Sequence, residues 1–278
     1  MSPRLRRHRG WRNIGRLAPA LIVLVLVVVV PLGRVVWTSL HRSSPTGNEM
    51  VGFDNYTHLF TNRGWWLAVA TSLVIVAAVV VVQIVLGIVL GAAIHRVGVV
   101  WPVTRVLVLL PFVLLSVVSV VTWRDAVSGG YLAEWFNIDD PGPAMRLAAV
   151  TVGEMWRGTG LVAAVVALAL SAVPRSLANS TIADGATGLQ RWRRVVLPAI
   201  APALAGVAVF RVLDTYRVLD GPLLADDPDL ATAPFLTWTT QFTAFEWGLG
   251  AAMSVIVLLV AVLLAAIVGP LFRVRRLL

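Results

Sequence analysis

The chain has 278 residues, of which 58% are hydrophobic and 13% charged, and its formal net charge is +9. A soluble domain carries about 25% charged residues, and a single core of this length cannot bury so large an apolar surplus. The composition therefore indicates a membrane protein. Basic residues collect on the cytoplasmic side of such proteins, so the positive charge does not predict a nucleic-acid partner.

The sequence contains neither cysteine nor lysine, so all 23 basic residues are Arg. The lack of cysteine excludes disulfides and thiolate metal sites. The phosphate-binding loop of an NTPase needs a lysine on the nucleotide phosphates, so we expect any ATP hydrolysis to occur in a partner. The four His residues are scattered without the spacing of metal ligands, and we expect no metal, cofactor or catalytic residue in this chain.

Six apolar segments reach the length of about 18 residues that a transmembrane helix needs. In chain order they cover 17–40, 66–94, 106–123, 147–173, 198–219 and 248–272. The Arg-rich start is also typical of a secretory signal, but its apolar run is long and no A-x-A-like cleavage site follows, which favours an uncleaved first helix. We therefore expect an all-α polytopic membrane protein of about six spans, with one transmembrane domain over 1–278.

The distribution of Arg predicts the orientation of these spans. With the N-terminus inside, 15 of the 23 Arg residues fall in cytoplasmic segments, in accord with the positive-inside rule. Both termini are then cytoplasmic, with a basic tail at 1–16, a cytoplasmic loop at 174–197 and an outer loop at 220–246. Asp184 is the only one of the 14 acidic residues that this topology places in a cytoplasmic segment, which indicates a specific role.

The cytoplasmic loop and its flanks read ALALSAVPRSLANSTIADGATGLQRWRRVVLPAIAPAL from Ala167 to Leu204. Pro174 can begin a short helix, Gly185 can break it with a left-handed or sharp turn, and Trp192 gives a second short helix an apolar anchor. Two short helices at a bend form a compact knob that suits a cleft on another protein. The alternative is an ordinary amphipathic loop on the membrane surface.

This segment resembles the EAA loop of ABC-importer permeases. The match rests on the D-G-A triplet, on a Trp where the family usually has Phe, and on the Leu-Pro and Pro that follow. An Asn stands where the family has the Glu of its name-giving triplet, so the docking contact lacks that charge. The resemblance implies that an ATP-binding subunit, which itself binds ATP and Mg, docks on Asn179, Asp184, Gly185, Ala186 and Trp192.

Shorter matches along the chain resemble sugar-importer permeases of the maltose-transporter type. They comprise Val51–Phe60, Trp123-Arg124, Phe210-Arg211-x-x-Asp214 and Gly248–Ser254. The resemblance implies the type I permease fold in a bacterial plasma membrane, a second homologous permease, two ATP-binding subunits and an extracytoplasmic solute-binding lipoprotein. It favours a sugar as the solute, with a non-sugar solute as the alternative.

Several ionisable side chains lie inside predicted spans, where a charge costs about 2.5–3.5 kcal/mol on insertion scales and normally faces the protein interior. Glu154 and Arg157 are three residues apart and share a helix face, and so do Arg211 and Asp214. These groups either line the transport pathway or lock helices together. The pathway candidates are Glu154, Trp156, Arg157, Arg211, Asp214, Thr215 and Tyr216, with Gln83 as a weaker one.

Two other classes of protein fit the sequence less well. A stand-alone secondary transporter is expected to show internal repeats with broken helices in both halves, and no repeat is visible. A membrane-embedded enzyme needs His or carboxylate groups clustered at one depth, and the His residues are scattered. The sequence therefore predicts a transport subunit and not an enzyme.

Overall fold

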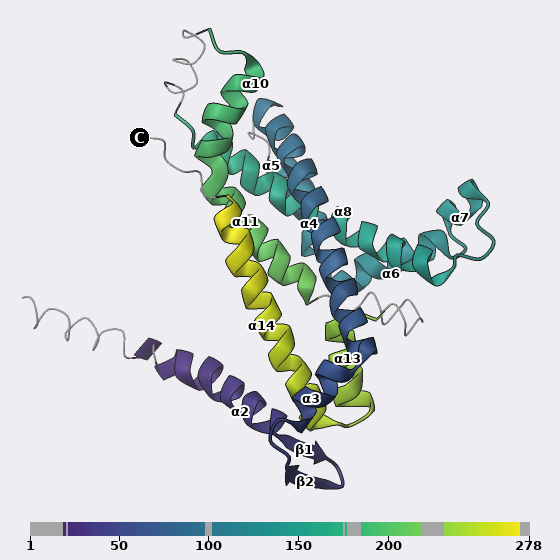
Figure 1. The fold of residues 1–278 in the computed structure, drawn as a ribbon. Helices are drawn as coiled ribbons and strands as arrows, with labels where there is room; N and C mark the ends of the chain where they lie inside the picture. The colour runs from purple at the N-terminus through teal and green to yellow at the C-terminus, as the bar shows by residue number, and fades with distance from the viewer. Residues whose placement is uncertain are drawn as a thin grey trace, which may run out of the picture. The chain divides into compact units, whose positions relative to one another are not determined.

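A computed structural model describes residues 19–20, 22–97, 102–174, 176, 185–217 and 231–272, without the side chains of 102, 103 and 105. The chain forms two compact units, Met1–Thr61 with Thr237–Ile256, and Asn62–Leu236 with Val257–Leu278. Both units are built mainly of helices (Figure 1).

The first unit combines an apolar helix with a polar hairpin. Its described elements are η1 (Val25–Val29), α2 (Val30–Ser39), β1 (His41–Ser44), β2 (Gly47–Met50), α3 (Asp54–Thr61), η4 (Thr239–Thr243) and the first part of α14 (Trp247–Leu271). The strands pair antiparallel, with His41 opposite Met50 and Ser44 opposite Gly47. Hydrophobic periodicity gives no signal for this hairpin, because β2 is exposed along its whole length.

Side-chain hydrogen bonds hold α3 to the end of α2 and to the start of β1 in the first unit. The amide of Asn55 donates to the backbone oxygens of Ser39 and His41 at 2.8 and 3.0 Å, and the hydroxyls of Tyr56 and Ser39 lie 2.7 Å apart. At the start of α14, a Cβ on Gly248 would overlap the backbone carbonyl of His41. The Asn-Tyr pair and the glycine, all within segments of the family resemblance, therefore have structural roles here.

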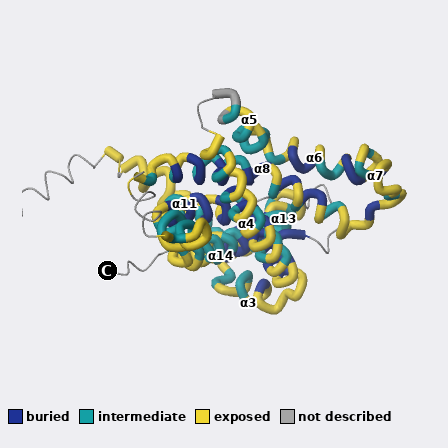
Figure 2. Tube along the Cα trace, turned by 90° about the horizontal axis from the view of Figure 1, so that it is seen from above, coloured by how far each residue is buried: buried dark blue, intermediate teal, exposed yellow. Residues whose placement is uncertain are grey.

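The second unit is a bundle of helices, in which the helix over Pro143–Ser171 packs against several others. Its described elements are α4 (Arg63–Val97), α5 (Pro102–Val113), α6 (Ser116–Val127), α7 (Tyr131–Phe136), α8 (Pro143–Ser171), α10 (Gly188–Arg191), η2 (Trp192–Val196), α11 (Leu197–Tyr216), α13 (Ala233–Trp238, which crosses the unit boundary) and the rest of α14. Helix α8 packs against α4, α5, α6 and α11. Buried positions recur along α4, α8 and α11, drawn dark blue in Figure 2.

Five of the described helices are long and apolar enough to cross a membrane, or six if the bent pair α5–α6 forms one span. The prediction of one helix over 106–123 is wrong, because the chain bends by 89° within that segment. Leu115 adopts extended backbone at φ −58° and ψ 141°, which ends the first helix. Pro111, inside α5, has no N–H to donate and weakens the helix just before the break.

The fifth span begins earlier than predicted. A helical stretch of 29 residues runs from Gly188 to Tyr216, about 43 Å at 1.5 Å per residue, against about 30 Å of hydrocarbon in a bilayer. Its first ten residues lie in the segment expected to be a loop. The expected second short helix is therefore the protruding end of the fifth span and not a separate element.

A proline explains the wide π-helical turn near the start of this span. Pro198 lacks an N–H and would crowd the carbonyl four residues before it. The turn η2 ends two residues earlier, with the N–H of Leu197 bonded to the oxygen of Trp192. The same arrangement occurs in η1, which ends two residues before Pro31. In both places a widened turn lets the helix continue through a proline.

Candidate functional site

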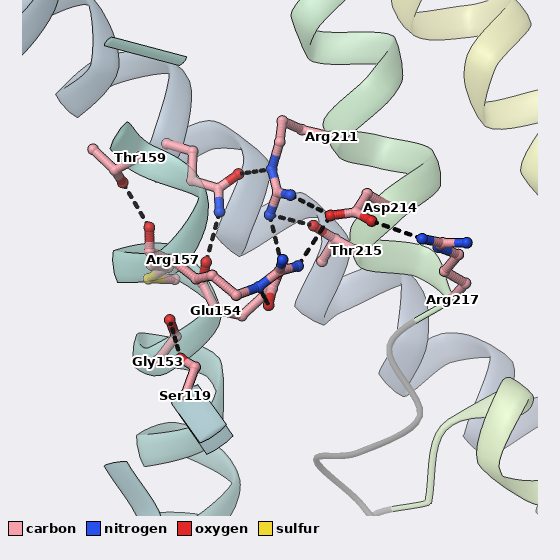
Figure 3. Close-up of polar contacts among 11 residues, drawn as sticks. Ser119, Gly153, Glu154, Arg157, Thr159, Arg211, Asp214, Thr215 and Arg217 are labelled. Carbon is pink, nitrogen blue, oxygen red and sulfur yellow. Dashed lines mark hydrogen bonds and ion pairs between the residues drawn. The ribbon is translucent and has the colours of Figure 1, made fainter. Parts of the chain in front are cut away.

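Two arginines share one buried carboxylate in the second unit (Figure 3). Glu154 on α8 accepts from Arg157 Nε at 2.8 Å and Nη2 at 2.8 Å. It also accepts from Arg211 Nη2 on α11 at 2.6 Å. Charge-assisted bonds of this kind are about twice as strong as neutral ones, so this carboxylate joins α8 firmly to α11.

Asp214 supplies the second carboxylate of the network. Its Oδ2 accepts from Arg157 Nη2 at 3.0 Å and from Arg211 Nη1. Its Oδ1 accepts from Arg217 Nη2 at 3.2 Å. The side chain of Arg217 is 79% exposed. The helical spacing of three residues between Arg211 and Asp214 allows their pairing. Two arginines and two carboxylates thus form an inner quartet with no net charge.

Gln83 connects α4 to this quartet. Its Oε1 accepts from Arg211 Nε at 2.9 Å, and its Nε2 donates to the backbone oxygen of Glu154 at 2.8 Å. The side chain is fully buried. One amide therefore uses a donor and an acceptor to hold two other helices.

Two residues shape the space around the guanidinium groups. A Cβ on Gly158 would overlap Gln83 Nε2 and the Arg211 guanidinium, so only glycine leaves room for both. The ring of Phe112 on α5 lies 5.4 Å from the guanidinium carbon of Arg157 and 5.7 Å from that of Arg211. An aromatic face within about 6 Å of a cation attracts it.

Burial makes the pairing of these charges necessary. The exposed fraction is 0% for Arg211, 2% for Glu154 and 7% for Arg157. A buried charge without a partner is very costly, and paired charges still need their remaining hydrogen bonds satisfied. The quartet with Gln83 meets this requirement, which makes it a strong structural clamp. Within the described ranges, no group of three or more His, Cys, Asp or Glu side chains is placed to hold a metal ion.

The structure places the remaining pathway candidates in three different settings. Thr215 is buried and accepts from Arg211 Nη2 at 3.3 Å. Tyr216 packs in an apolar cluster with α4 and α14, and its buried hydroxyl has no hydrogen-bond partner among the described residues. Trp156 is 42% exposed, and its ring lies 6.4 Å from that of Trp123.

The predicted docking loop is described in part. Asn179 and Asp184 lie outside the described residues. Gly185 has φ +71°, which confirms the predicted left-handed turn. Ala186 follows it, half-buried and outside any helix. The expected apolar anchor is also confirmed, since Trp192 packs against a buried cluster formed by α8 and α11.

The sequence does not indicate that three residues, Gln83, Phe112 and Gly158, belong to the network. Gln83 reads as a lone polar residue in an apolar span, although a polar residue inside a span usually has a partner. Phe112 and Gly158 look like ordinary apolar and small residues of membrane helices. The lone amide was the only available signal, because pairing across 128 residues of sequence leaves no local pattern.

Comparison with known proteins identifies relatives along most of the chain. The trehalose transport system permease protein SugA of Mycobacterium tuberculosis is 31% identical over 250 residues, covering 86% of this chain and 81% of that protein. The sulfoquinovosyl glycerol transport system permease protein SmoG of Agrobacterium fabrum is 25% identical, covering 98% and 96%. The sn-glycerol-3-phosphate permease UgpA of Escherichia coli is 27% identical, covering 92% of each chain. No family model matches the chain.

Solved structures share the fold. A chain of a bacterial ABC transporter that imports the acidic polysaccharide alginate superposes with a TM-score of 0.74 at 17% identity, covering 97% of this chain and 98% of that one. A chain of the inward-facing MetNI methionine ABC transporter gives a TM-score of 0.59 at 16% identity, covering 79% and 97%.

The apolar helices and the permease relatives define a multi-pass protein of the plasma membrane, and the solved structures show that it has the fold found in ABC importers. The chain belongs to the permease subunits of ABC importers of the carbohydrate-uptake, maltose-transporter-like type. This confirms the family and fold class predicted from the D-G-A loop and the apolar spans.

Proposed function

We propose that this permease imports a sugar together with a second homologous permease, two ATP-binding subunits and an extracytoplasmic binding protein that delivers the solute. The 31% identity with a trehalose permease over most of both chains carries the proposal. The likeness to a sulfoquinovosyl glycerol permease supports it further. A phosphorylated polyol is the second candidate class of solute, because the glycerol-3-phosphate permease is 27% identical.

In this proposal the ATP-binding partners hold ATP and Mg and perform the hydrolysis. The chain has no lysine, so it cannot form the G-K-[ST] phosphate loop of such an enzyme. Its part is to change between inward-open and outward-open states, an equilibrium that each ligand shifts only by its differential affinity for the two states.

The segment between α8 and α10 is the proposed docking loop for an ATP-binding subunit, with both chain termini on the same cytoplasmic side. The left-handed Gly185 directly before Ala186 and the capping box of Thr187 with Gln190 support a defined turn at its end. Trp192 ties this turn to the bundle. A push on the loop therefore reaches α11 directly.

Among the pathway candidates, we assign solute contact to Trp156 and Asp214. Trp156 offers an exposed aromatic face beside the half-buried Trp123, and sugars stack on such faces. The side chain of Asp214 keeps 11% exposure, more than the other members of the inner quartet. The remaining candidates are enclosed within one subunit and hold helices together.

Purification and uptake test the proposal together. The chain, its genomic neighbours for the other subunits and the binding protein are co-expressed, and the complex is isolated through a tag on this chain. We expect an ATPase subunit to co-purify and proteoliposomes to accumulate a labelled sugar from a panel that includes trehalose, maltose, sulfoquinovosyl glycerol and glycerol-3-phosphate. If no ATPase subunit co-purifies, the importer role is overturned. If the proteoliposomes take up glycerol-3-phosphate and none of the sugars, the assignment of a sugar as the solute is overturned.

A further inference from the structure

We propose that Gln83 is a positioning residue that joins α4 to both helices flanking the docking loop, so that α4, α8 and α11 move as one rigid lever. The proposal rests on the proposed function, because the lever transmits the movement of the ATP-binding subunits. It assigns Gln83, Arg211 and Glu154 to coupling and not to recognition of the solute.

The first argument is the position of the clamp relative to the loop. Helix α8 ends at Ser171 before the loop, and the next helix starts at Gly188 after it. Glu154 lies about 26 Å along α8 from Ser171, at 1.5 Å per residue. That distance spans most of the roughly 30 Å of hydrocarbon in a bilayer. The clamp therefore fastens the flanking helices far from the end at which they are pushed.

A second fastening lies near the loop itself. Six buried apolar residues of α8 and α11 form one cluster, and Trp192 packs against it. They are Val162, Val166, Leu170, Ile200, Leu204 and Val207. Two helices held at a single point can pivot about it, whereas two helices held at both ends cannot. The apolar cluster and the polar clamp together make the pair rigid.

Gln83 extends this rigidity to the third helix. Its amide accepts from Arg211 on α11 and donates to the backbone of α8 at Glu154. An apolar side chain of similar size would keep the packing but leave the Arg211 Nε–H without that acceptor. Gly158 provides the space for both side chains, so the contact is built into the backbone of α8.

Burial separates this role from contact with the solute. Gln83 and Arg211 are both 0% exposed within the single subunit, and each hydrogen-bonding group named above is directed at another protein group. A solute cannot reach Gln83 while these bonds persist. Loss of the amide should therefore change how much sugar moves per ATP and leave the choice of sugar unchanged.

The first experiment compares Gln83→Leu with Thr151→Val in the complete transporter, reconstituted in proteoliposomes with its binding protein. Thr151 is the matched control, because the bond that its hydroxyl makes among the described residues goes to the oxygen of Leu147 on its own helix. For Gln83→Leu we expect sugar transported per ATP to fall, because α4 is then no longer tied to Arg211 and to the backbone of Glu154 when the two flanking helices move. The half-saturating sugar concentration and the order of preferred sugars should stay as in the wild type, as should all properties of Thr151→Val.

Two outcomes overturn the proposal. One is an unchanged ratio of sugar to ATP in Gln83→Leu, and the other is a changed order of preferred sugars, which would place Gln83 in the pathway. A wild-type complex that imports no sugar would instead refute the proposed function, so the two failures can be told apart.

The second experiment does not depend on the folding of a Gln83 variant. The chain has no cysteine, so Val80→Cys and Val212→Cys supply the only two thiols of this subunit, and the transporter without these two substitutions is oxidised in parallel as the control. Both positions belong to one buried cluster between α4 and α11. After oxidation with copper phenanthroline, we expect the cross-linked transporter to keep at least about half of its uptake, because helices of a rigid lever do not move against each other. Loss of uptake on cross-linking, restored by reduction, would show that α4 and α11 slide and would overturn the lever.

Discussion

Arg211 on α11 donates a 2.9 Å hydrogen bond from Nε to the side-chain oxygen of Gln83 on α4, 128 residues earlier in the chain. The same guanidinium reaches Glu154 on α8 and Asp214 on its own helix. One fully buried side chain thus connects three membrane helices. Because these partners lie on three different helices, we expect loss of this side chain to lower the stability of the bundle.

Replacing Arg211 by Met should destabilise the protein far more than replacing Arg217 by Met. Both residues pair with Asp214, but only Arg211 is buried. Breaking a buried ion pair costs about 3–5 kcal/mol, whereas an exposed pair contributes about 0–1 kcal/mol. Thermal unfolding of the detergent-purified protein measures the difference. Equal losses of stability in the two variants would contradict the assignment of the clamp.

Gly158→Ala should be destabilising, although alanine is the better helix former. The added Cβ would overlap Gln83 and Arg211, and overpacking of this kind costs about 1–3 kcal/mol. Gly206→Ala on α11 is the matched control, because a Cβ there meets nothing within 4 Å and should stabilise the helix by about 0.8–1 kcal/mol. We expect the unfolding temperature to fall in Gly158→Ala and to rise in Gly206→Ala. A higher unfolding temperature in Gly158→Ala would show that Gln83 and Arg211 can move away from α8 without loss of stability.

Gly185→Ala should weaken coupling to the ATPase while leaving the bundle intact. Gly185 has φ +71°, and a left-handed conformation costs an L-residue about 1–2 kcal/mol. Gly188→Ala serves as control, since that glycine has no positive φ and open space for a Cβ. The readout is ATPase activity stimulated by the loaded binding protein, with protein yield as a check. Normal stimulation in Gly185→Ala would argue against a required turn at this position.

Trp156→Ala should raise the half-saturating sugar concentration, and Trp156→Phe should restore most of the affinity. The reason is the exposed face of Trp156 beside Trp123, because truncation removes a stacking surface that Phe retains. Uptake across a range of sugar concentrations measures both variants, with the ratio of sugar to ATP expected to stay constant. An unaltered half-saturating concentration in Trp156→Ala would remove this residue from the pathway.

The apolar spans were predictable because length and hydropathy decide whether a helix can cross a bilayer. The left-handed turn at Gly185 was predictable for a similar reason, since only the local backbone is involved. The break at Leu115 and the early start of the fifth span at Gly188 were not predictable. In an apolar environment a helix ends or continues according to its packing and backbone hydrogen bonds, which hydropathy does not record.

The sequence by itself determined the class of this protein. Its composition required a membrane, its lack of lysine excluded a phosphate loop, and its D-G-A segment with Leu-Pro beyond it indicated an importer permease. It also predicted that Glu154, Arg157, Arg211 and Asp214 face the protein interior, because charges in lipid need partners. Only the tertiary structure decided which partners they have. Their pairing joins α4, α8 and α11 across long stretches of sequence, and the distances between such groups are set by the packing of helices and not by their order in the chain.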